Sequence, residues 1–178
     1  MKKTNPLKIS EIEKIARNVR EKYNVSFDSP FPILDFIEEL NEEDLLTVQY
    51  LEDDNLIFEA DTPAKYNPVD NFIYVKESVL QELEDNEYRS NFTLAHELFH
   101  FLQFRVLNFQ FEDVDNCPHY MDPEWQANEF AAQLLLPTNY IVGDCNTKNI
   151  AERFKISEEC VVTRKLYYER RLKRSKEK

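Results

Sequence analysis

One short segment carries residue types that could do chemistry: His96-Glu97-Leu98-Phe99-His100, which has the pattern HExxH. Two histidines four residues apart lie one turn apart on the same face of a helix, so both imidazoles can ligate one metal ion. Glu97 follows the first histidine directly, and would lie close enough to take a proton from a water activated by that ion. The alternative is that two ordinary histidines flank a glutamate by coincidence.

The sequence around the motif favours the metal. Residues 88–104 predict a helix that is apolar nearly all round, as expected of a buried central helix. Polar groups buried in such a helix are costly unless they bind something. The chain has only 3 histidines, and Val106 stands where the pattern HExxHxxGxxH would place another ligand. The remaining protein ligand is therefore expected to be a carboxylate.

A second expected helix, over about residues 122–136, offers that carboxylate. We favour Glu124, because the apolar residues of this helix lie nearer to it than to the rival carboxylate, Glu129. The two glutamates are about 140° apart around the helix. Asn128 shares the face of Glu124 and could accept a hydrogen bond from the outer nitrogen of a ligating imidazole. An ordinary, partly buried amide is the alternative for Asn128.

The rest of the chain predicts the elements that position these two helices. Apolar residues at helical spacing indicate a first helix with Ser10 as its N-cap. Helices are expected over 9–23, 33–40, 77–84, 88–104 and 122–136, with an irregular stretch at 105–121. Strands are expected at 45–51, 56–60 and 72–76. This order predicts an α+β fold, with a small three-stranded sheet packed on a helical core that carries the HExxH helix.

Composition limits the class of protein. A chain of 178 residues, 42% of them hydrophobic, fits one globular domain or one domain with a small appendage. No stretch approaches the roughly 18 uncharged apolar residues that cross a bilayer, so we expect a cytoplasmic protein without a membrane segment. Cys117, Cys145 and Cys160 lack CxxC spacing and predict neither a disulfide framework nor a thiolate metal site. The single glycine, Gly143, excludes glycine-rich phosphate loops.

The net charge of −12 is unevenly distributed. Residues 1–22 carry seven Lys and Arg against three Glu, and residues 163–178 carry eight against two. Residues 23–162 carry seven against 29 Asp and Glu. An acidic body of this kind repels nucleic acid and favours basic partners. The basic ends are either solvated tails or the source of a weak nucleic-acid contact.

Three segments carry a family resemblance: Phe72-Ile73-Tyr74-Val75, the stretch from Arg89 to His100, and the stretch from Glu124 to Pro137. They resemble the ImmA/IrrE family of zinc metallopeptidases, over roughly residues 70–170. The resemblance implies a gluzincin-like peptidase with Zn²⁺ as its cofactor. It places His96, His100 and Glu124 at the positions of zinc ligands and Glu97 at that of the catalytic glutamate. The family usually has Gly where this chain has Phe99, whose side chain could fill space beside the metal helix and limit substrate access.

The C-terminal segment also resembles the family. Residues 149–157 and 158–164 predict a helix, a tight turn and a capped helix, which together are helix-turn-helix-like. Glu158 and Glu159 begin the second helix and would repel phosphates, which favours a packing unit over a DNA reader. The DNA-binding alternative depends on Arg164, Lys165, Arg170, Arg171, Lys173 and Arg174. We expect a metallopeptidase-like domain over 1–145 and a helix-turn-helix-like segment over 146–178, packed on the same domain.

The predicted function is that of a cytoplasmic zinc-dependent endopeptidase with Glu97 as general base. The resemblance implies that it cleaves a regulatory protein, such as a DNA-binding repressor, in a circuit of a phage, another mobile element or a stress response. A basic substrate would suit the acidic body. His119, Tyr120 or Tyr66 could stabilise the oxyanion, although His119 also fits an exposed loop position.

Two other hypotheses remain open at this point. One is a regulatory protein- or DNA-binding module built on a peptidase-like fold with weak or no catalysis, and Phe99 is its main support. The other is a toxin–antitoxin or phage component held by a partner, which would share the peptidase chemistry. Metal content separates the binding module from the enzyme, because only an enzyme of this class needs a retained zinc ion.

Overall fold

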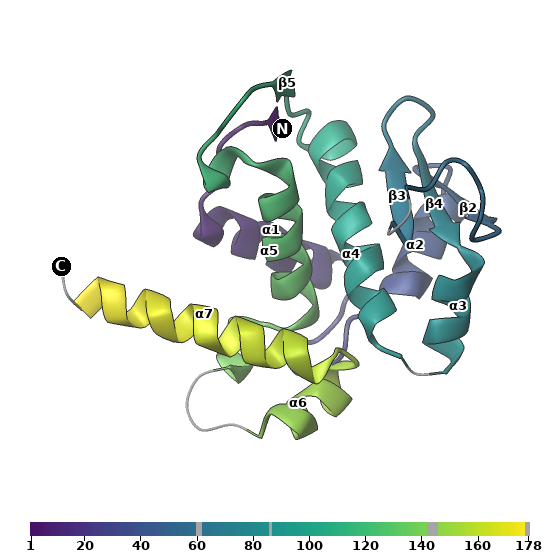
Figure 1. The fold of residues 1–178 in the computed structure, drawn as a ribbon. Helices are drawn as coiled ribbons and strands as arrows, with labels where there is room; N and C mark the ends of the chain where they lie inside the picture. The colour runs from purple at the N-terminus through teal and green to yellow at the C-terminus, as the bar shows by residue number, and fades with distance from the viewer. Residues whose placement is uncertain (60–61, 86, 142–145, 177–178) are drawn as a thin grey trace.

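The computed structural model describes residues 1–59, 62–85, 87–141 and 146–176 and has the predicted α+β architecture, with a small sheet beside a helical core (Figure 1). The helices are α1 (Ile9–Lys22), α2 (Ile33–Glu42), α3 (Glu77–Glu84), α4 (Arg89–Phe101), α5 (Pro123–Leu135), α6 (Thr147–Phe154) and α7 (Glu158–Lys176). The strands are β1 (Lys2–Lys3), β2 (Thr47–Leu51), β3 (Ala64–Asn67), β4 (Phe72–Lys76) and β5 (Glu112–Asp113).

Helices α4 and α5 lie side by side at the centre, and α1 packs against α5 (Figure 1). The core around these helices contains fully buried apolar side chains, among them Leu94, Leu98, Phe130 and Leu134, and Phe99 of α4 stacks on Phe130 of α5. Burying each such side chain contributes about 1.5–3 kcal/mol, so this pair of helices is the rigid centre of the fold. The start of α5 is fixed by its N-cap, because the Asp122 side chain accepts a hydrogen bond from the Glu124 backbone N–H at 3.0 Å.

The three-stranded sheet has the order β2-β4-β3. Strand β4 pairs in parallel with β2 and antiparallel with β3, and its residues Ile73 and Val75 are buried in the core. Strand β3 is an edge strand that packs against α4. It therefore lies directly beside the helix that carries the HExxH motif.

The third strand is not where the sequence analysis placed it. The expected strand at 56–60 is wrong: Leu56 is 100% exposed, and the Phe58 N–H donates to the Asn55 carbonyl in a turn. Residue 60 lies outside the described residues. The strand is β3 instead, in which Ala64 and Tyr66 alternate toward the core. Residues 56–60 are more apolar in sequence, but it is residues 64–67 whose side chains alternate between buried and partly buried, as in a strand packed on a core.

Three further differences concern the ends of elements. Lys8, not Ser10, is the N-cap of α1, and its backbone N–H donates to Glu11 Oε2 at 2.7 Å. Strands β1 and β5 pair antiparallel, so the stretch expected to be irregular contains a strand. Helix α4 continues into a π-helical segment, Leu102–Val106, before the chain turns away.

Helices α6 and α7 form the expected helix-turn-helix-like unit, with Lys155 in the left-handed region (φ 53°) at the end of α6. The Asn91 side chain of α4 donates to the Lys155 carbonyl at 2.8 Å. Arg164 of α7 is buried, where its Nε donates to the Leu136 carbonyl at 2.9 Å. Arg164 is therefore not available to nucleic acid, and the side chains of Arg171 and Arg174 lie outside the described residues. Figure 1 shows the far half of α7 extending beyond the body of the molecule.

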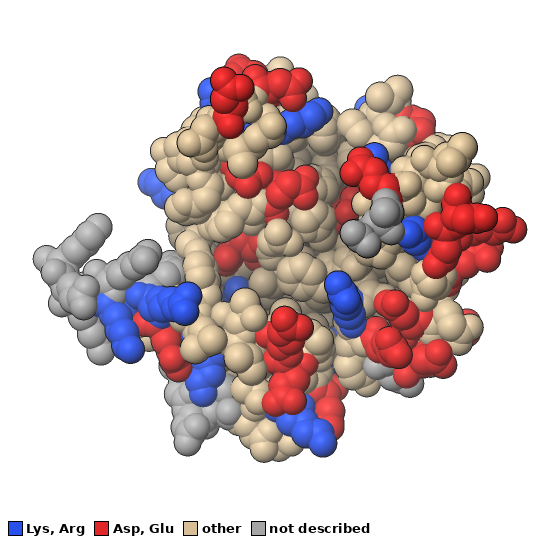
Figure 2. All heavy atoms as spheres, in the orientation of Figure 1, with Lys and Arg blue, Asp and Glu red and all other residues tan. Residues whose placement is uncertain are grey.

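Acidic side chains gather in some regions of the surface. Figure 2 shows Asp and Glu over the sheet and α3 and again near β5, each with some Lys and Arg beside them, and Lys and Arg along the far half of α7 with acidic groups among them. Cys117 and Cys160 are free thiols, while Cys145 and Gly143 lie outside the described residues. In the described parts of the chain, no helix combines the length and the apolar character that crossing a membrane requires.

Candidate metal centre

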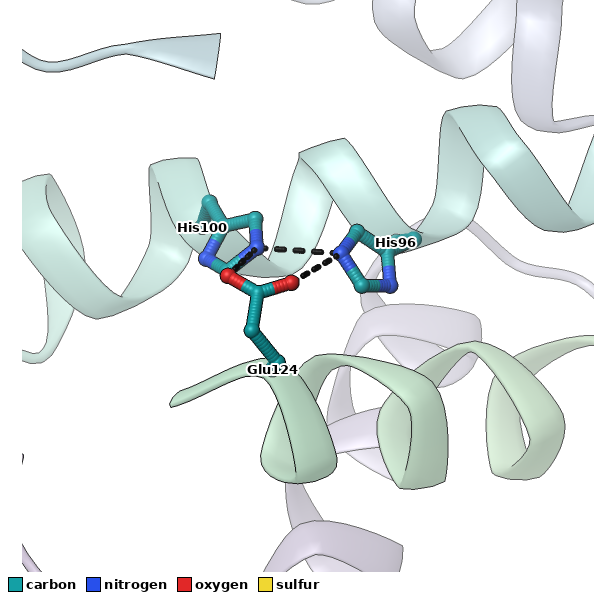
Figure 3. Close-up of side chains that lie close together, drawn as sticks. All are labelled: His96, His100 and Glu124. Carbon is teal, nitrogen blue, oxygen red and sulfur yellow. Dashed lines mark hydrogen bonds and ion pairs between the residues drawn. The ribbon is translucent and has the colours of Figure 1, made fainter. Parts of the chain in front are cut away.

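The two histidines of the HExxH motif meet a glutamate from the neighbouring helix. His96 and His100 project from α4 on the same face, and Glu124 reaches them from the first turn of α5 (Figure 3). The two Nε2 atoms are 3.0 Å apart. Glu124 Oε2 lies 3.2 Å from His96 Nε2, and its Oε1 lies 3.4 Å from His100 Nε2.

The glutamate–histidine separations are close to those around a single metal ion, and the two Nε2 atoms, at 3.0 Å, are somewhat nearer to each other. Zinc binds histidine nitrogen and carboxylate oxygen at about 2.0–2.2 Å, so neighbouring ligand atoms of a tetrahedral site are about 3.3–3.5 Å apart. One ligand atom from each of the three residues lies within 4.8 Å of the others. Two imidazoles and one carboxylate are also the kind of donor set that binds zinc in hydrolytic enzymes. The cluster can therefore hold a metal ion.

The electrostatics of the cluster are those of a carboxylate among imidazoles. Hydrogen bonds from His100 and His96 hold the pKa of Glu124 well below its usual range. Burial opposes the charged form of His100, but its hydrogen bond to Glu124 and the charges of Glu97 and Glu124 outweigh burial and raise its pKa. Glu124 is therefore ionised throughout the physiological range, which is the state that a cation site requires.

Glu97 lies beside the cluster and is held by the sheet. Its Oε2 accepts a hydrogen bond from the Tyr66 backbone N–H of β3 at 2.7 Å, while Oε1 lies 4.0 Å from His96 Nε2. Burial raises the pKa of Glu97, against the opposing charges of His100 and His96. A buried carboxyl with one oxygen fixed and the other facing the cluster is suited to accept and release a proton.

Each histidine also has a hydrogen-bond partner at Nδ1, the ring nitrogen that faces away from the cluster. His96 Nδ1 lies 3.1 Å from Asn128 Oδ1, the position that the sequence analysis expected for Asn128. His100 Nδ1 lies 3.0 Å from Gln103 Oε1. The sequence analysis missed Gln103, although a glutamine three residues after His100 lies on the same helix face and could have indicated it.

The rival carboxylate lies elsewhere. Glu129 Oε1 accepts a hydrogen bond from Gln133 Nε2 at 2.7 Å and lies 3.6 Å from Arg164 Nη1. Both Glu129 and Arg164 are buried, on the side of α5 that faces α7. The structure thus brings Glu124, and not Glu129, to the two histidines.

A cavity of about 440 Å³ opens onto the cluster. Its lining comes from the N-terminal segment, β3 and its flanks, α4, the chain after α4, and the start of α5, and includes Tyr66, Glu97 and all three cluster residues. Figure 2 shows acidic atoms in the hollow on this face. Phe99 is not part of the lining: it is fully buried and stacks on Phe130, with ring centroids 4.6 Å apart. The concern that Phe99 narrows access to the metal helix is therefore removed.

The three residues suggested for oxyanion stabilisation are not brought together. Tyr66 lines the cavity, but its hydroxyl donates to Asn71 Oδ1 at 3.0 Å. His119 and Tyr120 are exposed, outside the cavity lining, and the His119 ring meets the Trp125 ring edge-on at 4.7 Å. The exposed position that was the alternative for His119 is the one observed.

The fold and the His-His-Glu cluster together have the form of a metallopeptidase domain. A family model, Peptidase M78, described as an IrrE N-terminal-like domain, matches residues 54–165. The chain belongs to this family, the IrrE/ImmA group of metallopeptidases.

A solved structure shares the fold. A Mycobacterium tuberculosis transcriptional regulator superposes with a TM-score of 0.56 and 15% sequence identity, over 86% of this chain. The matched region is 54% of that protein, so this chain spans about half its length. No curated protein matches the chain significantly.

Proposed function

We propose that the protein is a zinc-dependent endopeptidase whose zinc ligands are His96, His100 and Glu124. The observation that carries the proposal is the convergence of two Nε2 atoms and one carboxylate at 3.0–3.4 Å beside a cavity. Membership of a metallopeptidase family supports a protein substrate. A bound zinc ion would supply Lewis acidity, which activates a water and polarises the scissile carbonyl.

Glu97 would carry the proton through the reaction. Its Oε1 faces the cluster and would take a proton from the attacking water, then deliver the same proton to the leaving amine. The Tyr66 backbone N–H holds the other oxygen in place, so the carboxyl needs no reorientation between the two transfers. Asn128 and Gln103 would keep the two imidazoles aimed at the ion through their outer nitrogens.

Of the three candidates for contact with the oxyanion or the substrate, Tyr66 has the best support, because it lines the cavity. Its hydroxyl would have to leave Asn71 to reach a substrate oxygen. His119 and Tyr120 would need a larger movement, since both lie outside the lining.

We further propose that the substrate is a basic cytoplasmic regulatory protein, such as a DNA-binding repressor. The charge of the chain, −12 overall and concentrated between residues 23 and 162, supports a basic partner. The structural neighbour is named as a transcriptional regulator, which agrees with a regulatory setting. Residues 1–145 and 146–178 would act as one unit, because Arg164 and Asn91 tie α7 and α6 to α5 and α4. The competing binding module has lost its main support, since Phe99 packs in the core.

The direct test is the variant Glu97→Gln, with zinc content and peptide cleavage measured on the same preparation. We expect about one zinc per chain in both proteins, and a loss of about 10²–10⁴-fold in cleavage of a fluorescence-quenched library of Lys- and Arg-rich peptides. Glu84→Gln, which changes an exposed carboxylate on α3, is the matched control and should leave both readouts unchanged. Full cleavage by Glu97→Gln, or a wild-type protein that neither retains zinc nor cleaves, would contradict the proposal.

A further inference from the structure

His100 stands at the end of a chain of hydrogen bonds that leads away from the metal centre into the protein. Its Nδ1 lies 3.0 Å from Gln103 Oε1, and Gln103 Nε2 donates to Gln126 Oε1 at 2.9 Å. Gln126 Nε2 in turn donates to the backbone carbonyls of Asn5 and Tyr120, at 2.8 and 2.9 Å. Both glutamine side chains are completely buried, with 0% exposure.

The direction of every bond in this chain is set at its far end. A backbone carbonyl can only accept a hydrogen bond, so the NH₂ group of Gln126 must face Asn5 and Tyr120. The oxygen of Gln126 then faces Gln103, which must present its own NH₂ group there and its oxygen to His100. Reversing either amide would set donor against donor or acceptor against acceptor in a buried place, which is strongly unfavourable.

The two segments that carry these carbonyls are bonded to each other. The Leu7 N–H donates to the Tyr120 carbonyl at 2.9 Å, and the Thr4 N–H, next to Asn5, donates to the Met121 carbonyl at 2.8 Å. These bonds fasten the N-terminal segment to the short helical turn His119–Met121 that precedes α5. The acceptors at the far end therefore keep their places relative to Gln126.

The near end of the chain fixes a proton on His100. If Nδ1 were bare, its lone pair would face the lone pairs of Gln103 Oε1 at 3.0 Å. Nδ1 must therefore carry a hydrogen in both states of the ring: the charged ring also donates from Nε2 to Glu124, and the neutral ring has its lone pair on Nε2. Nε2 is the atom that faces His96 and Glu124.

We propose that Gln103 and Gln126 are positioning residues that hold His100 in the one neutral tautomer able to ligate a metal through Nε2. The inference rests on the proposed function only in taking His100 as a ligand, because the proton on Nδ1 follows from the hydrogen bonds alone. His96 is held differently: its partner Asn128 is exposed, so solvent can reach and turn that amide.

The first experiment measures zinc affinity by competition with a chromophoric chelator. Gln103→Met keeps the length of the side chain but removes the acceptor, and we expect zinc affinity to fall about 10–100-fold. Gln126→Met should lower it less, by several-fold, because it only frees the Gln103 amide to turn. Since Gln126 acts through Gln103, the double variant should bind zinc no more weakly than Gln103→Met alone.

The matched control is Gln133→Met. Gln133 is also a buried glutamine of α5, but it lies about two turns after Gln126 and bonds to Glu129 and Arg164 instead of Gln103. This variant should lower thermal stability and leave zinc affinity unchanged. Equal loss of affinity in Gln133→Met, or fully additive losses in the Gln103→Met, Gln126→Met double variant, would overturn the proposal.

The second experiment needs no variant and no activity. Long-range ¹H–¹⁵N spectra of the metal-free wild-type protein show which ring nitrogen of each histidine carries hydrogen. We expect the neutral His100 ring to carry its hydrogen on Nδ1, and this tautomer preference to disappear in Gln103→Met. A bare Nδ1 in the wild type would overturn the proposal even if zinc binds and peptides are cleaved. A protonated Nδ1 in a protein that fails to retain zinc would leave the hydrogen-bond chain standing and remove the peptidase proposal instead.

Discussion

The two faces of α5 put the same residue type to opposite uses. Glu124 faces the histidines of α4 and an open cavity, and its side chain is 65% exposed. Glu129, five residues later, faces Arg164 of α7 and is 8% exposed. Glu129 has a full positive charge and the Gln133 amide as partners, whereas Glu124 has only two imidazoles. Glu124 can still bind a metal cation, because its imidazole partners can ligate the same ion. The charge of Glu129 is already balanced by Arg164, so Glu129 is not expected to bind one.

The variant Glu124→Gln tests the side of α5 that faces the histidines and the cavity, here called the open face. We expect zinc affinity to fall on the order of a thousandfold, beyond the 10–100-fold typical of losing an outer partner, because a charged ligand is lost. Chelator competition measures the effect. The free energy of unfolding of the metal-free protein should change little at pH 8, because this side chain is largely exposed. Zinc affinity within tenfold of the wild type would mean that Glu124 is not a ligand.

The variant Glu129→Gln tests the side of α5 that faces Arg164 of α7, here called the closed face. It leaves the Arg164 charge buried without its counter-ion, and removing one partner of a buried pair costs about 3 kcal/mol of unfolding free energy. Arg164 keeps its bond to the Leu136 carbonyl, so the fold should survive. Urea denaturation of the metal-free protein measures the loss, and zinc affinity serves as the control. A clear fall in zinc affinity would show that the two faces are coupled.

The smallest effect is a pH dependence that belongs to the open face alone. The lowered pKa of Glu124 contributes stability above about pH 4.3 that is lost as pH falls, and the raised pKa of His100 contributes stability below about pH 6.5 that is lost as pH rises. The difference in unfolding free energy between metal-free wild type and Glu124→Gln should therefore be largest between about pH 4.5 and 6.5.

Denaturation curves taken from about pH 4 to pH 9 measure this difference. Zinc should reverse the trend on the alkaline side, because metal binding needs unprotonated imidazoles and so strengthens as pH rises. A flat difference over the whole range in the metal-free proteins would contradict the ion pair between His100 and Glu124.

Sequence predicted the parts of the molecule that depend on local spacing. The shared face of His96 and His100 and the choice of Glu124 over Glu129 each follow from positions along a single helix, and the structure brings Glu124 to the two histidines. The sequence analysis missed strand β3 because β3 forms through its pairing with β4. Residues 64–67 themselves are less apolar than residues 56–60, where the strand was expected. Contacts between distant segments are invisible to spacing arguments of this kind.

The Gln103–Gln126 pair shows the same limit within the candidate site. Each glutamine is unremarkable on its own helix, and only the crossing of the π-helical segment with α5 brings the two amides within 2.9 Å. Phe99 shows the converse, because its size suggested a blocked site while its direction, into the α4–α5 interface, could not be read from the sequence. Residue type indicates which chemistry is available, and packing decides where it points.

The burial pattern of α5 has a consequence for how this protein can vary. Buried residues occupy most of the helix: Pro123, Gln126, Ala127, Glu129, Phe130, Ala131, Gln133, Leu134 and Leu135. Its exposed polar residues Glu124 and Asn128 face the histidines. We therefore expect a saturation mutagenesis scan of α5 to find few positions that accept substitution. Sequence differences between related proteins should occur mainly in the other helices.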